Sequence, residues 1–290
     1  MNGLQTNRRW AVVSAAVVGA LALALLYPAL RWLAGEWLGN DYYSHGPLVP
    51  LVSALVGWRL WVKWPAERRR LGASNAGLPL TIVAMAVYLY ALFQRAYFVA
   101  SLAMLALLAG LIWYLLGAAA LRRLAFPLGF LLFMIPLPFV EPLSVPLAQF
   151  TGVCAAGVVQ LFGVPITISG AQVTLPAAAT GSGASLVVGA QCSGLRSIVA
   201  LLTLVGLVVF IVQGPWWGKL LLAFSSIPIA IAGNIARVAS LLVVANTWGA
   251  EAGFNYYHDY SSIVFFVSAV VLLVIFSRWV RCREIRDDIF

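Results

Sequence analysis

Long apolar stretches without charge alternate with short charged groups along most of the chain. A helix needs about 20 largely apolar residues to cross the hydrocarbon core of a membrane. Eight stretches approach that length and predict spans over residues 11–33, 47–62, 78–94, 96–117, 124–140, 193–213, 219–240 and 258–278. The first also resembles a signal-peptide core, but further spans follow it, so we expect it to remain uncleaved. The pattern predicts an all-α polytopic membrane protein, with residues 1–290 forming one domain.

Residues 141–191 depart from this pattern, because they contain almost no charge and yet do not form simple spans. The spans on either side begin and end on the same side of the membrane, so the segment crosses zero or two times, and we favour zero. Residues 143–163 suit a helix that rests at the outer interface or packs among other spans. Residues 166–175 alternate around Ser169–Gly170 and predict a small extracytoplasmic β-hairpin, with residues 184–189 as a candidate third strand.

Composition supports a membrane protein and excludes a soluble one. The hydrophobic fraction is 63% and the charged fraction 9%, against about 45–50% and about 25% in soluble chains. So few charges cannot cover a soluble core of this size. The net charge of +9 would suggest a nucleic-acid partner on a soluble protein. Here it is better explained by basic cytoplasmic loops, and no nucleic-acid partner is expected.

The basic residues predict the orientation of the chain. If both termini are cytoplasmic, 14 of the 18 lysines and arginines lie inside, as the positive-inside rule requires. These are Arg8, Arg9, Arg59, Lys63, Arg68, Arg69, Arg70, Arg122, Arg123, Lys219, Arg278, Arg281, Arg283 and Arg286. The cations left outside are Arg31, Arg95, Arg196 and Arg237.

Three chemically different side chains lie at the outer ends of the last three predicted spans: Cys192, Arg237 and His258. A helix N-terminus and a nearby cation such as Arg196 both favour a reactive thiolate. Histidine can transfer a proton near neutral pH, and a fixed guanidinium can bind a developing oxyanion. Nucleophile, acid/base and oxyanion donor together indicate acyl transfer.

Plainer explanations exist for each of these residues. A cysteine is often a small buried apolar residue, an arginine near a helix end can snorkel, and His258 can belong to an interfacial aromatic belt. Asn234 can hydrogen-bond Arg237 or a substrate amide, or join two helices. His45 fits a surface loop. Three cysteines and two histidines without metal-ligand spacing predict neither a structural metal site nor a disulfide framework.

Several motifs together resemble the exosortase/archaeosortase family of membrane-embedded cysteine transpeptidases. Residues 43–50 look like the early outer-loop motif of that family, and residues 163–175 look like the stretch before its active cysteine. Cys192-Ser-Gly-Leu-Arg196 is similar to its nucleophile motif and Asn234-Ile-Ala-Arg237 to its Asn-x-x-Arg motif. His258 lies where the family places its histidine.

The resemblance implies a thiol enzyme of the bacterial inner membrane with an extracytoplasmic active site. Its substrates would be exported proteins that end in a short motif, a transmembrane helix and a basic tail, a signal called PEP-CTERM that accompanies exopolysaccharide production. Membrane lipids would surround the site, and no cofactor and no fused C-terminal domain are expected. The implied catalytic residues are Cys192, Arg237 and His258, and the supporting residues are Arg196, Asn234, Ser193 and His45.

Two other functions remain open from the residues alone. In an anion transporter, Arg237 would bind its substrate within the membrane, and broken helices in repeated halves would be expected. In a lipid or polysaccharide transferase, His45 and His258 would act without a nucleophilic thiol.

Overall fold

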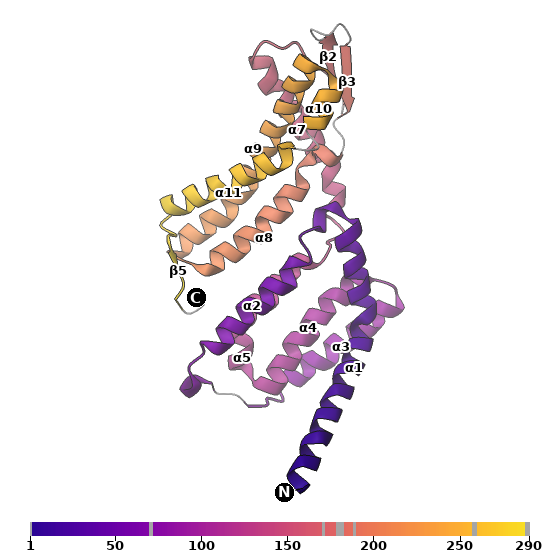
Figure 1. Ribbon diagram of the computed structural model, residues 1–290, viewed down its shortest axis with the longest axis vertical. Coiled ribbons are helices and arrows are strands. Elements are labelled where there is room, and N and C mark those ends of the chain that lie inside the picture. The colour runs from indigo at the N-terminus through magenta and orange to yellow at the C-terminus, as the bar shows by residue number, and fades with distance from the viewer. Residues whose placement is uncertain are drawn as a thin grey trace. The chain divides into compact units, whose positions relative to one another are not determined.

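The computed structural model describes residues 2–69, 72–169, 172–177, 183–187, 190–256 and 260–287 (Figure 1). The chain divides into two compact units, Met1–Pro136 and Leu137–Phe290. Each unit has its own packed helices and is described by itself.

The regular elements that the structure describes in the first unit are all helices. Its α-helices are α1 (Asn2–Gly39), α2 (Leu48–Val62), α3 (Gly77–Phe93), α4 (Tyr97–Leu116), α5 (Ala118–Arg123) and α6 (Ala125–Phe130). Short 3-10 helices are η1 (Asp41–Tyr43), η2 (Ala66–Arg68) and η3 (Leu131–Met134).

Helices α3 and α4 lie side by side as an antiparallel pair (Figure 1). Their backbones approach closely because glycines face the partner helix. A Cβ on Gly110 would lie 2.7 Å from Thr81 Oγ1, and a Cβ on Gly77 would overlap the backbone of Tyr114. Small residues permit this kind of close packing between membrane helices.

The structure differs from the sequence-based expectation over residues 124–140. The α-helix α6 ends at Phe130, the 3-10 helix η3 continues to Met134, and no helix follows before residue 141 within this described stretch. Pro136 and Pro138 explain the end of the helix, because proline lacks an N–H and disfavours helical geometry in the residue before it.

The second unit contains the remaining helices and two small sheets. Its helical elements are η4 (Glu141–Leu143), α7 (Ser144–Leu161), η5 (Ala190–Ser193), α8 (Leu195–Ile211), α9 (Trp216–Trp248), α10 (Ala250–Tyr256) and α11 (Ser262–Trp279). Its strands are β1 (Thr167–Ser169), β2 (Gln172–Ala177), β3 (Gly183–Val187), β4 (Val212–Gln213) and β5 (Glu284–Ile285).

Strands β1, β2 and β3 form an antiparallel sheet in that order between α7 and η5. Ile168 pairs with Val173, which in turn pairs with Leu186. Val173 is buried with Ile166 in an apolar cluster that also includes residues of α7 and α9. The alternation over residues 166–175 and the candidate third strand thus correspond to strands of one sheet.

Helix α9 is the central element of the second unit. It packs against α7, α8, α10 and α11. Its 33 residues give a length of about 50 Å, so the helix continues beyond the expected span of residues 219–240. A second apolar cluster joins it to α8 and α11 and includes Leu201, Leu222 and Leu273.

Five helical segments of the described chain are long and apolar enough to cross a membrane. They are Val17–Gly39, Tyr97–Leu116, Glu141–Leu161, Trp216–Trp248 and Ser262–Trp279. Three shorter apolar helices are Gly77–Phe93, Ala125–Met134 and Leu195–Ile211. The protein is therefore a helical, multi-pass membrane protein, while the number of eight spans and the extracytoplasmic place of residues 141–191 stay predictions.

Candidate active site

Cys192 lies in the 3-10 helix η5, directly before helix α8. Its side chain is half-buried and packs against the apolar cluster formed by α7, α9 and the three-stranded sheet. Gly194 then turns the chain into α8 with a φ of +70°. We expected Cys192 at the start of a helix. In the structure it lies in the tight turn that directly precedes helix α8.

Gly194 is required by its backbone conformation and by its surroundings. A positive φ is strained for residues with a Cβ. A Cβ at this position would also lie 2.6 Å from Cβ of Asn234 on helix α9. The absence of a side chain therefore lets the Cys192 turn approach α9 closely.

Asn234 connects this turn to two helices. Its side chain is 4% exposed, and Nδ2 donates one hydrogen bond to the carbonyl oxygen of Cys192 at 2.8 Å and another to Thr151 Oγ1 on α7 at 3.2 Å. The backbone of Cys192 is consequently held by α9 and, through Asn234, by α7.

The other polar atom of Asn234 has no such partner. A carbonyl oxygen can only accept hydrogen bonds, so Cys192 fixes which end of the amide is Nδ2. Oδ1 then remains buried and accepts no hydrogen bond in the described part of the chain. Buried acceptors of this kind are rare and call for an explanation, such as a water or a ligand.

Arg237 follows Asn234 by one helical turn, so the two side chains lie on neighbouring positions of one face of α9. The side chain of Arg237 is 7% exposed, and its terminal nitrogen donates a hydrogen bond to Ser262 Oγ at 3.2 Å. Ser262 is the first residue of α11, so this bond joins the middle of α9 to the beginning of α11.

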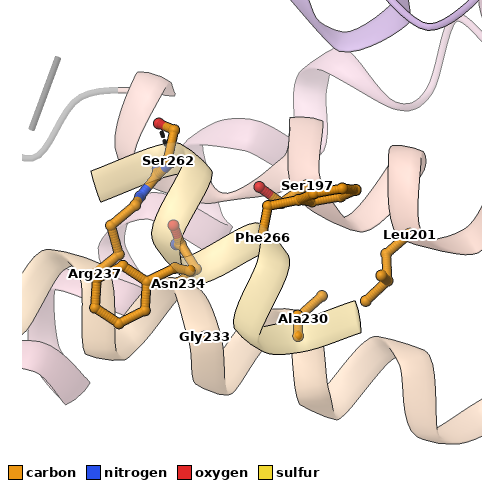
Figure 2. A pocket seen from close by; sticks show the side chains of 10 residues that line it. Ser197, Leu201, Ala230, Gly233, Asn234, Arg237, Ser262 and Phe266 are labelled. Carbon is orange, nitrogen blue, oxygen red and sulfur yellow. Dashed lines mark hydrogen bonds between the residues drawn. The ribbon is translucent and has the colours of Figure 1, made fainter. Parts of the chain in front are cut away.

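A narrow cavity lies between α8, α9 and α11, and Asn234 and Arg237 form part of its wall (Figure 2). The other lining residues are Ser197, Leu201, Ala230, Gly233, Ser262, Phe265, Phe266 and Ala269. Its volume of about 10 Å³ has room for about one water molecule. The buried amide and the buried guanidinium therefore border the same small space.

The family model for transmembrane exosortases matches residues 37–275 of the chain. The chain belongs to the transmembrane exosortase family. The match includes the turn around Cys192, the Asn234–Arg237 segment of α9 and position 258 in this exosortase. No curated protein and no solved structure matches the chain.

The remaining predicted site residues differ in where they lie. Ser193 is buried, and its Oγ accepts a hydrogen bond from the backbone N–H of Leu195 at 3.3 Å, at the start of α8. Arg196 is exposed in the first turn of α8. His258 lies outside the described residues.

His45 belongs to the first unit of this exosortase, whereas Cys192 and Arg237 belong to the second. The imidazole of His45 is half-buried and stacks on the buried ring of Tyr43, with 6.1 Å between ring centroids. Gly46 lies against the indole of Trp37, which donates a hydrogen bond to the carbonyl oxygen of Met134 at 2.8 Å. His45 therefore lies in a packed corner of its unit.

Thr151 and Ser262 were not predicted as site residues, although they contact Asn234 and Arg237. Ser262 follows His258 by four positions, which was a usable signal. The sequence around Thr151 contains no such signal, because single threonines are common in apolar membrane helices. Among the described residues, no group of three or more histidines, cysteines or acidic residues is arranged to hold a metal ion.

Proposed function

We propose that this exosortase cleaves the C-terminal sorting signal of exported proteins through a thioester on Cys192 and transfers the protein to an acceptor. One observation carries the proposal most directly. The buried amide of Asn234 holds the backbone of Cys192, while Arg237 follows one turn later on the same helix. The amide of Asn234 thereby links the turn that carries Cys192 to the cavity wall that it forms together with Arg237.

In the first step of the reaction, a carbon–sulfur bond to the scissile carbonyl carbon replaces its carbon–nitrogen bond. Sγ of Cys192 attacks that carbon, and His258 takes the thiol proton. The carbon–nitrogen bond then breaks, and His258 gives the proton to the leaving amine. An acceptor amine or a water next attacks the thioester, loses its proton to His258 and releases Cys192 as a thiol.

Arg237 is proposed to stabilise the negative charge that develops on the carbonyl oxygen. A buried and hydrogen-bonded guanidinium is already oriented, so it stabilises an oxyanion with little reorganisation. Its bond to Ser262 supports this role, because it restrains one end of the guanidinium. Oδ1 of Asn234 is proposed to accept a hydrogen bond from a substrate backbone N–H.

The family and the charge pattern together suggest where this chemistry takes place. We propose that the protein resides in the bacterial inner membrane, that both termini are cytoplasmic and that the site faces outward. The substrate would end in a short PEP-CTERM-like motif, a membrane helix and a basic tail. Its helix would enter from the bilayer while the motif rests at the outer surface.

The nucleophile is tested by comparing Cys192→Ala with Cys154→Ala in membranes that contain a candidate substrate. Cys154 is also half-buried, but it lies in the middle of α7, which makes it a matched control for losing one thiol. Full-length substrate is expected to accumulate with Cys192→Ala only. Normal processing by this variant would show that Cys192 is not the nucleophile.

The type of reaction is tested by mass spectrometry of the new C-terminus of the processed substrate. An added mass is expected if an acceptor amine resolves the thioester. A free carboxylate would instead assign hydrolysis, with water as the acceptor. Alkylation of Cys192 should also abolish activity, and bound substrate should slow that alkylation. This result would distinguish a thiol enzyme from the transporter and the transferase alternatives.

A further inference from the structure

A second cavity of the described chain, shallow and open to the surface, lies at the far end of α8 from Cys192, where α8 is followed by α9. It has a volume of about 430 Å³ and is lined by Gln213, Gly214, Lys219 and Arg286. Helix α8 has 17 residues and a length of about 25 Å. This cavity is therefore separate from the candidate active site.

A two-stranded ribbon fixes one wall of this cavity. Val212 pairs with Ile285, and Gln213 pairs with Glu284, so the chain after α11 returns to the end of α8. The ribbon is closed by a hydrogen bond from the backbone N–H of Arg286 to the carbonyl oxygen at position 211, at 2.9 Å.

The guanidinium of Arg286 is positioned by an aromatic contact. It lies 4.7 Å from the ring centroid of Phe210, within the range of a cation–π interaction. Its side chain is half-buried at the cavity wall. The position of this cation is thus set by the ribbon and by the end of α8.

The second cation, Lys219, comes from the first turn of α9 and is also half-buried. Within the described residues its ammonium has no hydrogen-bond or ion-pair partner. It lies near Cys282, since burial raises the pKa of the Cys282 thiol while the charge of Lys219 opposes that shift.

Two acidic residues of the described chain lie close to this cavity in the sequence. Glu284 and Asp287 both belong to the chain that follows α11, and both are exposed. Neither carboxylate lines the cavity, whose wall carries two cations. The described lining of the cavity therefore carries two basic side chains and no acidic one.

The surroundings of the cavity are typical of a membrane surface. Trp216 and Trp217 at the start of α9 are 77% and 41% exposed, and Trp279 at the end of α11 is 79% exposed. Tryptophan is enriched at the level of lipid headgroups, where its ring contacts the acyl chains and its N–H contacts water. The exposed tryptophans at the start of α9 and the end of α11 therefore favour a position of the cavity at the depth of lipid phosphates.

We propose that this cavity binds the phosphate group of an anionic phospholipid, with Lys219 and Arg286 as its two cationic ligands. An arginine presents paired donors that match phosphate oxygens, and a lysine adds a compact charge. The bound lipid would fasten the α8–α9 junction and the chain after α11 to the membrane surface.

The test compares lipid binding by the full-length protein and by single variants, using native mass spectrometry and thermal unfolding in phosphatidylglycerol or phosphatidylcholine. Lys219→Gln and Arg286→Gln are the site variants. Arg278→Gln is the matched control, since Arg278 is an exposed cation of the last turn of α11 that does not line the cavity. Lys219→Arg retains the charge and serves as the rescue variant.

Phosphatidylglycerol is expected to bind wild type and Arg278→Gln alike, and to bind each site variant about tenfold more weakly, with Lys219→Arg close to wild type. Equal weakening in Arg278→Gln would overturn the proposal in favour of general surface attraction. Equal binding of phosphatidylcholine would overturn it as well. If inorganic phosphate alone gave the same stabilisation, the ligand would be free phosphate and the lipid assignment would be wrong.

Discussion

At the scale of single residues, the most informative feature of this exosortase is the buried amide of Asn234, which donates a hydrogen bond to the backbone of Cys192. Asn234 was predicted to hydrogen-bond Arg237 or a substrate, or to join helices. In the structure it donates to the carbonyl oxygen of Cys192 and to Thr151. The sequence could identify Asn234, Arg237 and Cys192 as candidates for one site. It could not show that Asn234 contacts the carbonyl oxygen of Cys192, because that contact depends on the path of η5 in the fold.

Replacement of Asn234 tests whether this hydrogen bond positions Cys192. Asn234→Ala should remove the hydrogen bond to the half-buried carbonyl of Cys192, at a cost of about 1–3 kcal/mol. Processing should fall strongly, and more than in Thr151→Ala, which removes only the 3.2 Å bond. Asn234→Asp should be at least as damaging, because it points a carboxylate oxygen at that carbonyl. Thermal unfolding and substrate cleavage measure both effects, and equal activity in Thr151→Ala and Asn234→Ala would contradict this positioning role.

The geometry of Arg237 leads to a separate prediction. If a planar guanidinium binds the oxyanion, Arg237→Lys should reduce turnover nearly as much as Arg237→Ala, by about 100-fold or more. Ser262→Ala should have a smaller effect, since it removes one partner of the guanidinium and leaves the guanidinium itself in place. Single-turnover cleavage rates measure this order. Near wild-type turnover in Arg237→Lys would mean that Arg237 acts only as a positive charge.

At the scale of elements, the turn between the sheet and α8 determines where Cys192 lies. The strands over residues 167–187 and the helices around them could be predicted from alternation and from apolar length. The positive φ of Gly194 and its contact with Asn234 could not, because they depend on residues far apart in the sequence. The span predicted over residues 124–140 was wrong for a local reason instead, because Pro136 and Pro138 interrupt the helix.

Three glycine substitutions can distinguish the effect of backbone strain at a positive φ from the effect of a steric overlap with a neighbouring side chain. Gly163→Ala, at a φ of +84° with open space around it, should lose about 1–3 kcal/mol of stability through backbone strain alone. Gly194→Ala adds an overlap with Asn234, so it should lose more stability and also most of its activity. Gly157→Ala in α7 has neither problem and should resemble wild type. Unfolding midpoints and cleavage assays check this, and an active Gly194→Ala would show that the turn tolerates displacement.

At the scale of the whole molecule, charge and apolar length carry most of the information. A hydrophobic fraction of 63% was enough to predict a helical membrane protein, because lipid requires every backbone group to be paired within helices or closed barrels. The division into Met1–Pro136 and Leu137–Phe290 was not predicted. Internal contacts define it, and no change in composition marks the boundary at the paired prolines.

The orientation of the chain is a prediction from the distribution of basic residues, and it can be tested directly. Ala66 and Glu251 are both exposed, and the positive-inside rule places the first in the cytoplasm and the second outside. In a variant without its three cysteines, a membrane-impermeant maleimide should label Glu251→Cys in intact cells. It should label Ala66→Cys only after the cells are permeabilised. The reverse pattern would move the candidate active site to the cytoplasmic face, where it could not meet the outer end of an exported substrate.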